Sequence, residues 1–126
     1  MSAVPLQRAR LLAAAGAAAA LTGCGDQPRP TVVERGPIAL AMRDYRFAPQ
    51  TLRARAGQVE VQVVNRGRLP HALQLRLDGR ERLRIPTVLP GRRGSASARL
   101  PAGRYRFACP IANHEELGMH GVLTVR

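Results

Sequence analysis

The sequence predicts an all-β protein, a Greek-key β-sandwich of seven to eight short strands. Apolar and polar residues alternate in several short segments, most clearly over residues 59–65, as is typical of half-buried strands. Turn-forming segments such as Asp78-Gly79 and Leu89-Pro90-Gly91 separate these stretches at nearly even spacing. After Ala20, no segment combines a helical period with helix caps. Short strands with frequent turns therefore define the architecture.

The β-domain is expected to span residues 37–126, with its first strand beginning near Ile38. Tyr45 and Phe47 continue the first apolar stretch, and Pro49 ends it because proline cannot donate to a strand ladder. The segment 81–85 is expected to be an edge strand. The expected strands cover residues 38–42, 52–55, 59–65, 72–77, 81–85, 95–100, 104–109 and 121–126.

The first 23 residues have the features of an export signal. Arg8 and Arg10 precede an Ala/Leu-rich stretch, residues 11–21, which is too short to span a bilayer comfortably. The following Leu21-Thr22-Gly23-Cys24 resembles the lipobox of bacterial lipoproteins. This resemblance implies that residues 1–23 are a lipoprotein signal peptide and that Cys24 is lipidated. The alternative is a buried helix over 11–21 with Cys24 as an ordinary thiol.

Residues 24–36 are rich in turn formers and lack periodicity, so we expect a lipidated tether there. The tether would hold an exported domain at the cell membrane, on its periplasmic or other extracytoplasmic face. Nucleic acid is a poor candidate partner, because an export signal places the domain outside the cytoplasm. The chain also has no basic motif with interspersed aromatic residues on which bases could stack.

The chain is strongly basic, with 20 arginines and no lysine against 8 acidic residues, for a net charge of +12. Such a charge favours anionic lipid head groups and acidic protein partners, mainly by raising association rates. Only two cysteines are present. If lipid occupies Cys24, Cys109 has no disulfide partner, and a lone thiol in an exported protein is prone to oxidation unless a metal occupies it.

Cys109 opens the segment that carries the candidate metal ligands. Strand alternation places its side chain inward, on the same face as Tyr105 and Phe107. Pro110 then ends the strand, and His114 follows Cys109 after four intervening residues.

Two further ligand candidates complete the set. Met119 follows His114 after another four residues, just before the last strand, and His71 lies at the start of a different strand behind Pro70. A thiolate, a thioether and two imidazoles suit copper in both of its oxidation states. The sequence therefore predicts a site for one copper ion at one pole of the sandwich.

Other metal chemistries fit less well. Structural zinc prefers four strong ligands, and a methionine is a poor fourth. Hydrolysis would need an open coordination position and a general base such as Glu115 or Glu116, which nothing else in the sequence supports. His120 is expected to lie on the surface, with an alternative ligand or a titrating modulator as the less favoured interpretation.

The segment 105–125, with Pro70-His71, resembles the C-terminal copper loop of the cupredoxin family, which includes plastocyanin and azurin. Its C-x4-H-x4-M spacing is most similar to the sulfocyanin-like branch. The resemblance implies type 1 copper with His71, Cys109 and His114 equatorial and Met119 axial. The sequence departs from the family at Ala112-Asn113, where Pro-Gly is frequent, and at Ala72, where a polar residue is common. Both departures concern the reduction potential and the spectral type of the centre more than its ability to bind metal.

Electron transfer is the predicted function, as a non-enzymatic carrier of single electrons between exported or membrane-bound redox proteins. The alternative is a carrier or chaperone that delivers or sequesters copper, although a buried Cys-ligated centre favours redox use. The 103 residues left after cleavage give no room for the additional domains of a copper enzyme. An apolar collar is expected to contact the partner: Leu69, Pro70, Ile111, Ala112 and Leu117. The acidic pair Glu115 and Glu116 is expected to be solvated, with a role in partner recognition as the alternative.

Overall fold

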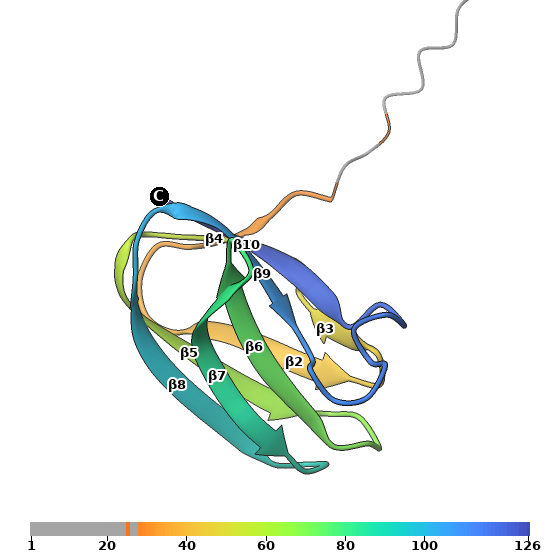
Figure 1. The fold of residues 1–126 in the computed structure, drawn as a ribbon. Coiled ribbons are helices and arrows are strands. Elements are labelled where there is room, and N and C mark those ends of the chain that lie inside the picture. Colours follow the sequence, from red (N-terminus) through yellow and green to blue (C-terminus); the bar gives the residue numbers. More distant parts are fainter. Residues whose placement is uncertain (1–24, 26–27) are drawn as a thin grey trace, which may run out of the picture.

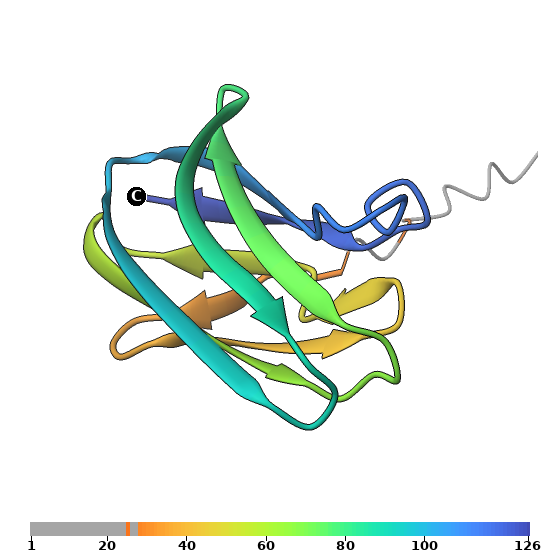
Figure 2. The same cartoon turned by 60° about the horizontal axis from the view of Figure 1, so that its bottom comes forward.

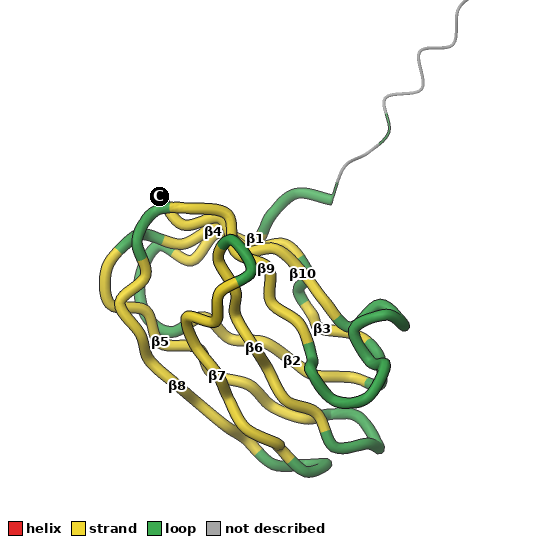
Figure 3. Tube along the Cα trace, in the orientation of Figure 1, coloured by secondary structure: helices red, strands yellow, loops and turns green. Residues whose placement is uncertain are grey.

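Ten strands form two mixed sheets in the computed structural model, which describes Gly25 and residues 28–126 (Figure 1). No helix occurs in these residues, and turns and loops join the strands (Figure 3). The strands are β1 (Thr31–Val33), β2 (Ile38–Arg43), β3 (Arg46–Ala48), β4 (Thr51–Ala54), β5 (Gly57–Asn65), β6 (His71–Leu77), β7 (Arg80–Val88), β8 (Arg93–Leu100), β9 (Gly103–Ala108) and β10 (His120–Val125).

The two sheets face each other as the layers of a sandwich (Figure 2). The larger sheet has the order β1-β4-β10-β9-β6-β7, and the smaller has the order β3-β2-β5-β8. β4 runs parallel to both β1 and β10, whereas β9 is antiparallel to β10 and to β6. The all-β prediction is confirmed, and β7 is an edge strand as expected.

Ten strands form where the sequence predicted seven to eight. One addition is β3, which a turn at Asp44 and Tyr45 separates from β2, with Tyr45 in a left-handed conformation at φ 62°. The other is β1, whose residues the sequence analysis assigned to an irregular tether. Residues 31–33 instead pair with β4, from Thr31 opposite Leu52 to Val33 opposite Ala54. Three residues are too few to show an alternating pattern in the sequence, so this strand is recognised only from its pairing with β4.

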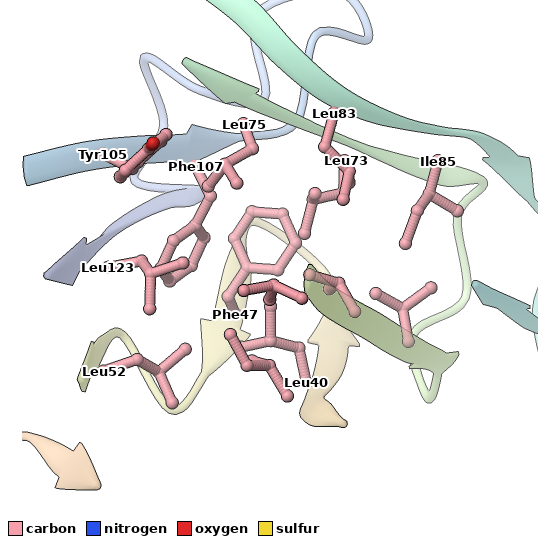
Figure 4. Close-up of a cluster of buried hydrophobic side chains, with 14 of the residues drawn as sticks. Leu40, Phe47, Leu52, Leu73, Leu75, Leu83, Ile85, Tyr105, Phe107 and Leu123 are labelled. Atoms are coloured by element: carbon pink, nitrogen blue, oxygen red, sulfur yellow. The ribbon is translucent and has the colours of Figure 1, made fainter. Parts of the chain in front are cut away.

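Alternating side chains from both sheets fill the core between them (Figure 4). In β5, for example, Val59, Val61 and Val63 are buried while the intervening residues are exposed. The rings of Phe47 and Phe107 meet edge to face, with centroids 5.3 Å apart, an arrangement that adds to the burial of their apolar surface. Phe107 lies two residues before Cys109, so this packing fixes the end of β9 that carries the thiol.

Three strand ends converge at one pole of the sandwich. β6 begins at His71, β9 ends at Ala108 and β10 begins at His120. Because β9 is antiparallel to both neighbours, and Ala108 lies opposite both Gln74 and His120, the segment 109–119 and the start of β6 lie at the same end of the larger sheet.

The predicted signal peptide, the lipobox and Cys24 lie outside the described residues. Within the part of the chain that is described, no helix is long and apolar enough to cross a membrane.

Candidate metal centre

His71, Cys109 and His114 converge at this pole. One potential ligand atom from each lies within 4.8 Å of the others. The two imidazole Nδ1 atoms are 3.3 Å apart, and the Cys109 Sγ is 3.6 Å from the Nδ1 of His114. His71 and Cys109 are fully buried and His114 is 7% exposed. Three of the four predicted ligands therefore come together from two separate parts of the chain.

The loop between β9 and β10 is closed on itself by backbone hydrogen bonds. The Cys109 N–H donates to the Met119 carbonyl, and the Met119 N–H donates to the His114 carbonyl, both at 3.0 Å. Met119, the fourth predicted ligand, is fully buried beside them in the chain. Ala112 takes a left-handed conformation at φ 45°, which L-residues adopt at some cost. These hydrogen bonds set the positions of Cys109, His114 and Met119 relative to one another.

Asp44 holds the ring of His71 in place through a hydrogen bond. The sequence did not indicate this role of Asp44. The Asp44 Oδ1 lies 3.0 Å from the His71 Nε2, on the side of the ring away from the cluster. When Nε2–H donates to this carboxylate, the Nδ1 lone pair is free and faces Cys109 and His114. That is the tautomer and orientation that a metal requires of a histidine ligand.

Asp44 also orders the chain that leads into His71. Its carboxylate accepts hydrogen bonds from the backbone N–H groups of Arg68 and Leu69. The Arg68 amide, together with the other donors, lowers the pKa of Asp44, although partial burial acts in the opposite direction. Gly67 leaves the room that this arrangement needs, because a Cβ there would lie 2.3 Å from the Asp44 Oδ1 and 3.0 Å from the His71 Nε2.

The thiol of Cys109 accepts a backbone hydrogen bond from β6. The Ala72 N–H points at Sγ over 3.5 Å. Ala72 therefore contributes through its main chain at the position where the family often has a polar side chain. A side chain elsewhere, that of Asn65, bonds to the carbonyls of Leu69 and Val88 and links the neighbouring loops.

Burial is the main electrostatic influence on His114. Desolvation lowers its pKa, the proximity of His71 lowers it further, and Asp44 acts weakly in the opposite direction. The neutral imidazole, which is the form that binds metal, is therefore favoured. A buried thiol with two convergent imidazole nitrogens, one of them on a ring that a carboxylate holds in place, fits a copper ion.

Tyr45 covers His114 on its outer side. The two rings meet edge to face with centroids 5.2 Å apart, and Tyr45 is 39% exposed. Most of the predicted collar lies open at this pole, with Leu69, Pro70, Ala112 and Leu117 exposed. Ile111 differs from these, because it is partly buried and packs against the hydrophobic core.

Glu115 binds two arginines across the sheet. Its Oε1 accepts from the Arg76 Nη2 at 2.6 Å and from the Arg106 Nε at 2.7 Å. Arg76 and Arg106 lie opposite each other on β6 and β9, so the residue after His114 fastens the loop to two strands. Partial burial opposes ionisation, but the two guanidinium groups outweigh it and the pKa of Glu115 is lowered. Of the acidic pair, Glu116 is the exposed member.

Replacing Glu115 by glutamine is expected to lower the free energy of unfolding at pH 7 by about 1 kcal/mol. Because the folded-state pKa lies below the unfolded one, the contribution is full above the unfolded pKa and is lost as the pH falls through the folded pKa. Urea unfolding at pH 7 and near pH 3 measures the difference. Glu116→Gln is the matched control. A Glu115→Gln effect of the same size at both pH values would contradict the ion-pair explanation.

His120 is not one of the three clustered residues. It is partly buried and lines a surface hollow with Pro110, Glu116 and Arg106. Among the described residues, it belongs to no cluster of three or more metal-binding side chains.

Comparison with known proteins agrees with this fold. The protein-family model for the cupredoxin-like domain matches residues 11–125. No curated protein matches the sequence.

Solved structures with a similar fold include three auracyanins. Reduced auracyanin from the photosynthetic bacterium Roseiflexus castenholzii is 17% identical with a TM-score of 0.67, and the match covers 75% of this chain and 99% of that one. Auracyanin B is 22% identical with a TM-score of 0.63 and coverages of 76% and 94%. Auracyanin A, a "blue" copper protein from Chloroflexus aurantiacus, is 18% identical with a TM-score of 0.60 and coverages of 72% and 100%. The family match spans most of the sequence, and these structures share its fold: the chain belongs to the cupredoxin-like family.

Proposed function

We propose that this protein is a type 1 copper protein that carries single electrons between redox proteins outside the cytoplasm, without being an enzyme itself. Lipid on Cys24 anchors it to the cell membrane. The observation that carries the proposal is the convergence of a buried thiol and two buried imidazole Nδ1 atoms within 4.8 Å. Auracyanin A, which shares the fold, is named as a blue copper protein.

His71, Cys109 and His114 hold the ion in the proposed centre, with Met119 as a weak fourth ligand. Copper bound there supplies a one-electron couple between Cu(II) and Cu(I). The chain keeps the ligands in one arrangement, because Asp44 fixes His71, the Ala72 amide fixes the sulfur and the loop hydrogen bonds fix His114. Ligands held in place need little reorganisation when an electron is gained or lost.

Electrons are proposed to pass through the His114 side of the centre. His114 is the most exposed of the three clustered residues, and Tyr45 lies against its ring. The proposed contact surface comprises the exposed members of the predicted collar, Leu69, Pro70, Ala112 and Leu117, with Glu116 and Tyr45. Full burial of the Cys109 thiol favours electron transfer over exchange of the metal with other proteins, since a copper carrier needs accessible ligands.

Addition of Cu(II) to the purified protein is expected to produce an intense visible absorption band from the thiolate–copper bond. Cys109→Ser should abolish the band, and His120→Ala should retain it because His120 lies outside the cluster. A colourless protein that binds Cu(I) tightly would instead favour the copper carrier. Mass spectrometry of the N-terminal peptide tests whether Cys24 bears lipid.

Replacing Asp44 by asparagine is expected to raise the reduction potential of the copper-loaded protein by about 60 mV, a tenfold shift in the Cu(I)/Cu(II) ratio. Asparagine keeps an acceptor for the His71 Nε2 but removes the negative charge that favours Cu(II). Protein-film voltammetry measures the change. Asp78→Asn, in the turn between β6 and β7 at the opposite end, removes the same charge and should leave the potential nearly unchanged. Equal shifts in both variants would show that Asp44 acts only through the net charge.

A further inference from the structure

Three arginines surround a shallow hollow on the outer face of the smaller sheet. Arg43 ends β2, Arg66 follows β5 and Arg93 begins β8, and all three are exposed and line the same hollow. Hydrogen bonding brings these ends together, because the Arg66 N–H donates to the Met42 carbonyl at 2.8 Å and Arg93 lies opposite Val64 on β5. Small and apolar side chains also line it: Ala39, Ala41, Ala48 and Val64.

More arginines flank this hollow. Arg46 lies opposite Arg43, and the Arg92 carbonyl accepts from the Asn65 N–H. Arg68 lies in the same loop as Arg66. All of these guanidinium groups are on exposed residues.

Within the described part of the chain, none of these six arginines forms an ion pair with a carboxylate. The larger sheet differs, because Glu115 pairs with Arg76 and Arg106, and Glu81 pairs with Arg84. Asp44 lies nearest in sequence to the hollow, but its carboxylate is committed to His71 and to two backbone amides. Unbalanced like charges repel one another and lower stability, so this surface is suited to an external anionic group.

The hollow adjoins the metal centre. Arg43 precedes Asp44, and Arg66 precedes Gly67, where an added Cβ would lie within 3.0 Å of side-chain atoms of both Asp44 and His71. Exposed apolar side chains border the same pole, namely Tyr45 at 39%, Leu69 at 36% and Leu89 at 57% exposure. An apolar contact area with a basic border on one side is the complement of a surface with carboxylates beside its own apolar patch.

We propose that Arg43, Arg66 and Arg93 form a docking surface for an acidic redox protein, whose carboxylates enter the hollow while its redox centre approaches His114. This inference rests on the proposed electron-transfer function and adds the charge of the partner and the side from which it approaches. Guanidinium groups bind carboxylates in bidentate geometry, which gives orientation as well as attraction. A protein partner is favoured over a membrane surface because the arginines lie beside the His114 side of the metal centre. Lipid bound to these arginines would cover the side through which electrons are proposed to pass.

The first test measures carboxylate binding in the metal-free protein. Titration calorimetry with hexaglutamate at low ionic strength is expected to show binding that the triple variant R43Q/R66Q/R93Q weakens at least tenfold. The matched control R80Q/R99Q/R104Q removes the same charge from exposed arginines that pair with no carboxylate among the described residues and lie toward the other end of the strands. It should weaken binding by less than about threefold. Equal weakening in the two variants would overturn the proposal.

The second test measures electron transfer in the copper-loaded protein. Hexacyanoferrate(III) takes one electron from the reduced protein and becomes hexacyanoferrate(II), and stopped-flow absorbance follows the returning visible band. The rate is expected to fall about tenfold in R43Q/R66Q/R93Q but much less in R80Q/R99Q/R104Q. Hexaglutamate should inhibit the reaction of the unmodified protein. An unchanged rate in the first variant would overturn the proposal.

A vesicle experiment separates the protein partner from a membrane. Co-sedimentation with phosphatidylglycerol vesicles through these three arginines, without hexaglutamate binding, would assign the surface to lipid and overturn the proposal. Absence of the visible band from the unmodified protein would refute the electron-transfer function itself. A normal band in every variant, with no difference between the two triple variants, would refute only the docking surface.

Discussion

Replacing Asn65 by alanine is expected to lower the free energy of unfolding by about 3 kcal/mol. Asn65 ends β5 and is fully buried. Its Nδ2 donates to the carbonyls of Leu69 and Val88, and its Oδ1 accepts from the Gly67 N–H, each at 2.8 Å. Alanine leaves these backbone groups without partners, at least one of them in a buried position, and an unsatisfied buried polar group is costly.

Replacing Asn65 is also expected to disturb the metal centre, because the Asn65 side chain holds the segment that leads directly into His71. Chemical denaturation of the metal-free protein measures stability, and the visible band measures the effect on copper binding. Asn113→Ala is the matched control. Asn113 is exposed and makes no side-chain hydrogen bond among the described residues, so its replacement should change stability by less than about 0.5 kcal/mol. An equally small effect at Asn65 would mean that water replaces the lost amide.

Gly121→Ala is expected to destabilise the protein by about 3 kcal/mol, the upper end of the usual range for overpacking. A Cβ at this position would lie 2.2 Å from the Phe107 ring and 2.4 Å from the Gln50 carbonyl oxygen. Neither group yields easily, because Phe107 is 1% exposed and packs on Phe47, and the Gln50 carbonyl accepts from the Val122 N–H. The added methyl group therefore displaces the end of β9 that carries Cys109.

Gly103→Ala provides the control for Gly121, since both glycines lie in the antiparallel pair of β9 and β10. A Cβ on Gly103 would meet the Leu77 Cδ1 at 2.9 Å. Leu77 is only partly buried, and its methyl group moves by a change of rotamer, so we expect a loss below about 1 kcal/mol. Thermal unfolding of the two variants checks the contrast. Similar losses in both would contradict the close packing of Phe107 on Gly121.

The loop of the metal centre could be predicted from the sequence because its residues are local. Cys109, His114 and Met119 lie within eleven residues of one another between two strands. His71 was found because a histidine at the start of an alternating segment faces the same pole. These features depend on strand periodicity and spacing, which the sequence displays directly.

The surroundings of the centre could not be predicted in this way. Asp44 and Asn65 each resemble ordinary turn residues, and their roles depend on contacts with Gly67, Leu69 and Val88 across separate turns. Glu115 was expected to be solvated, whereas it binds Arg76 and Arg106. Only the register between β6 and β9 places those two arginines opposite each other, and register between distant strands cannot be read from periodicity.

Strand β1 restricts where the domain can sit relative to its predicted anchor. Six residues, 25–30, separate Cys24 from Thr31, and a chain of that length spans at most roughly 20 Å. β1 runs parallel to β4, which runs parallel to β10, and β10 begins directly after the metal loop. The chain therefore enters the sheet from the direction of the metal centre. A lipid on Cys24 would therefore keep the whole domain close to the bilayer, which favours redox partners that lie in or beside the same membrane.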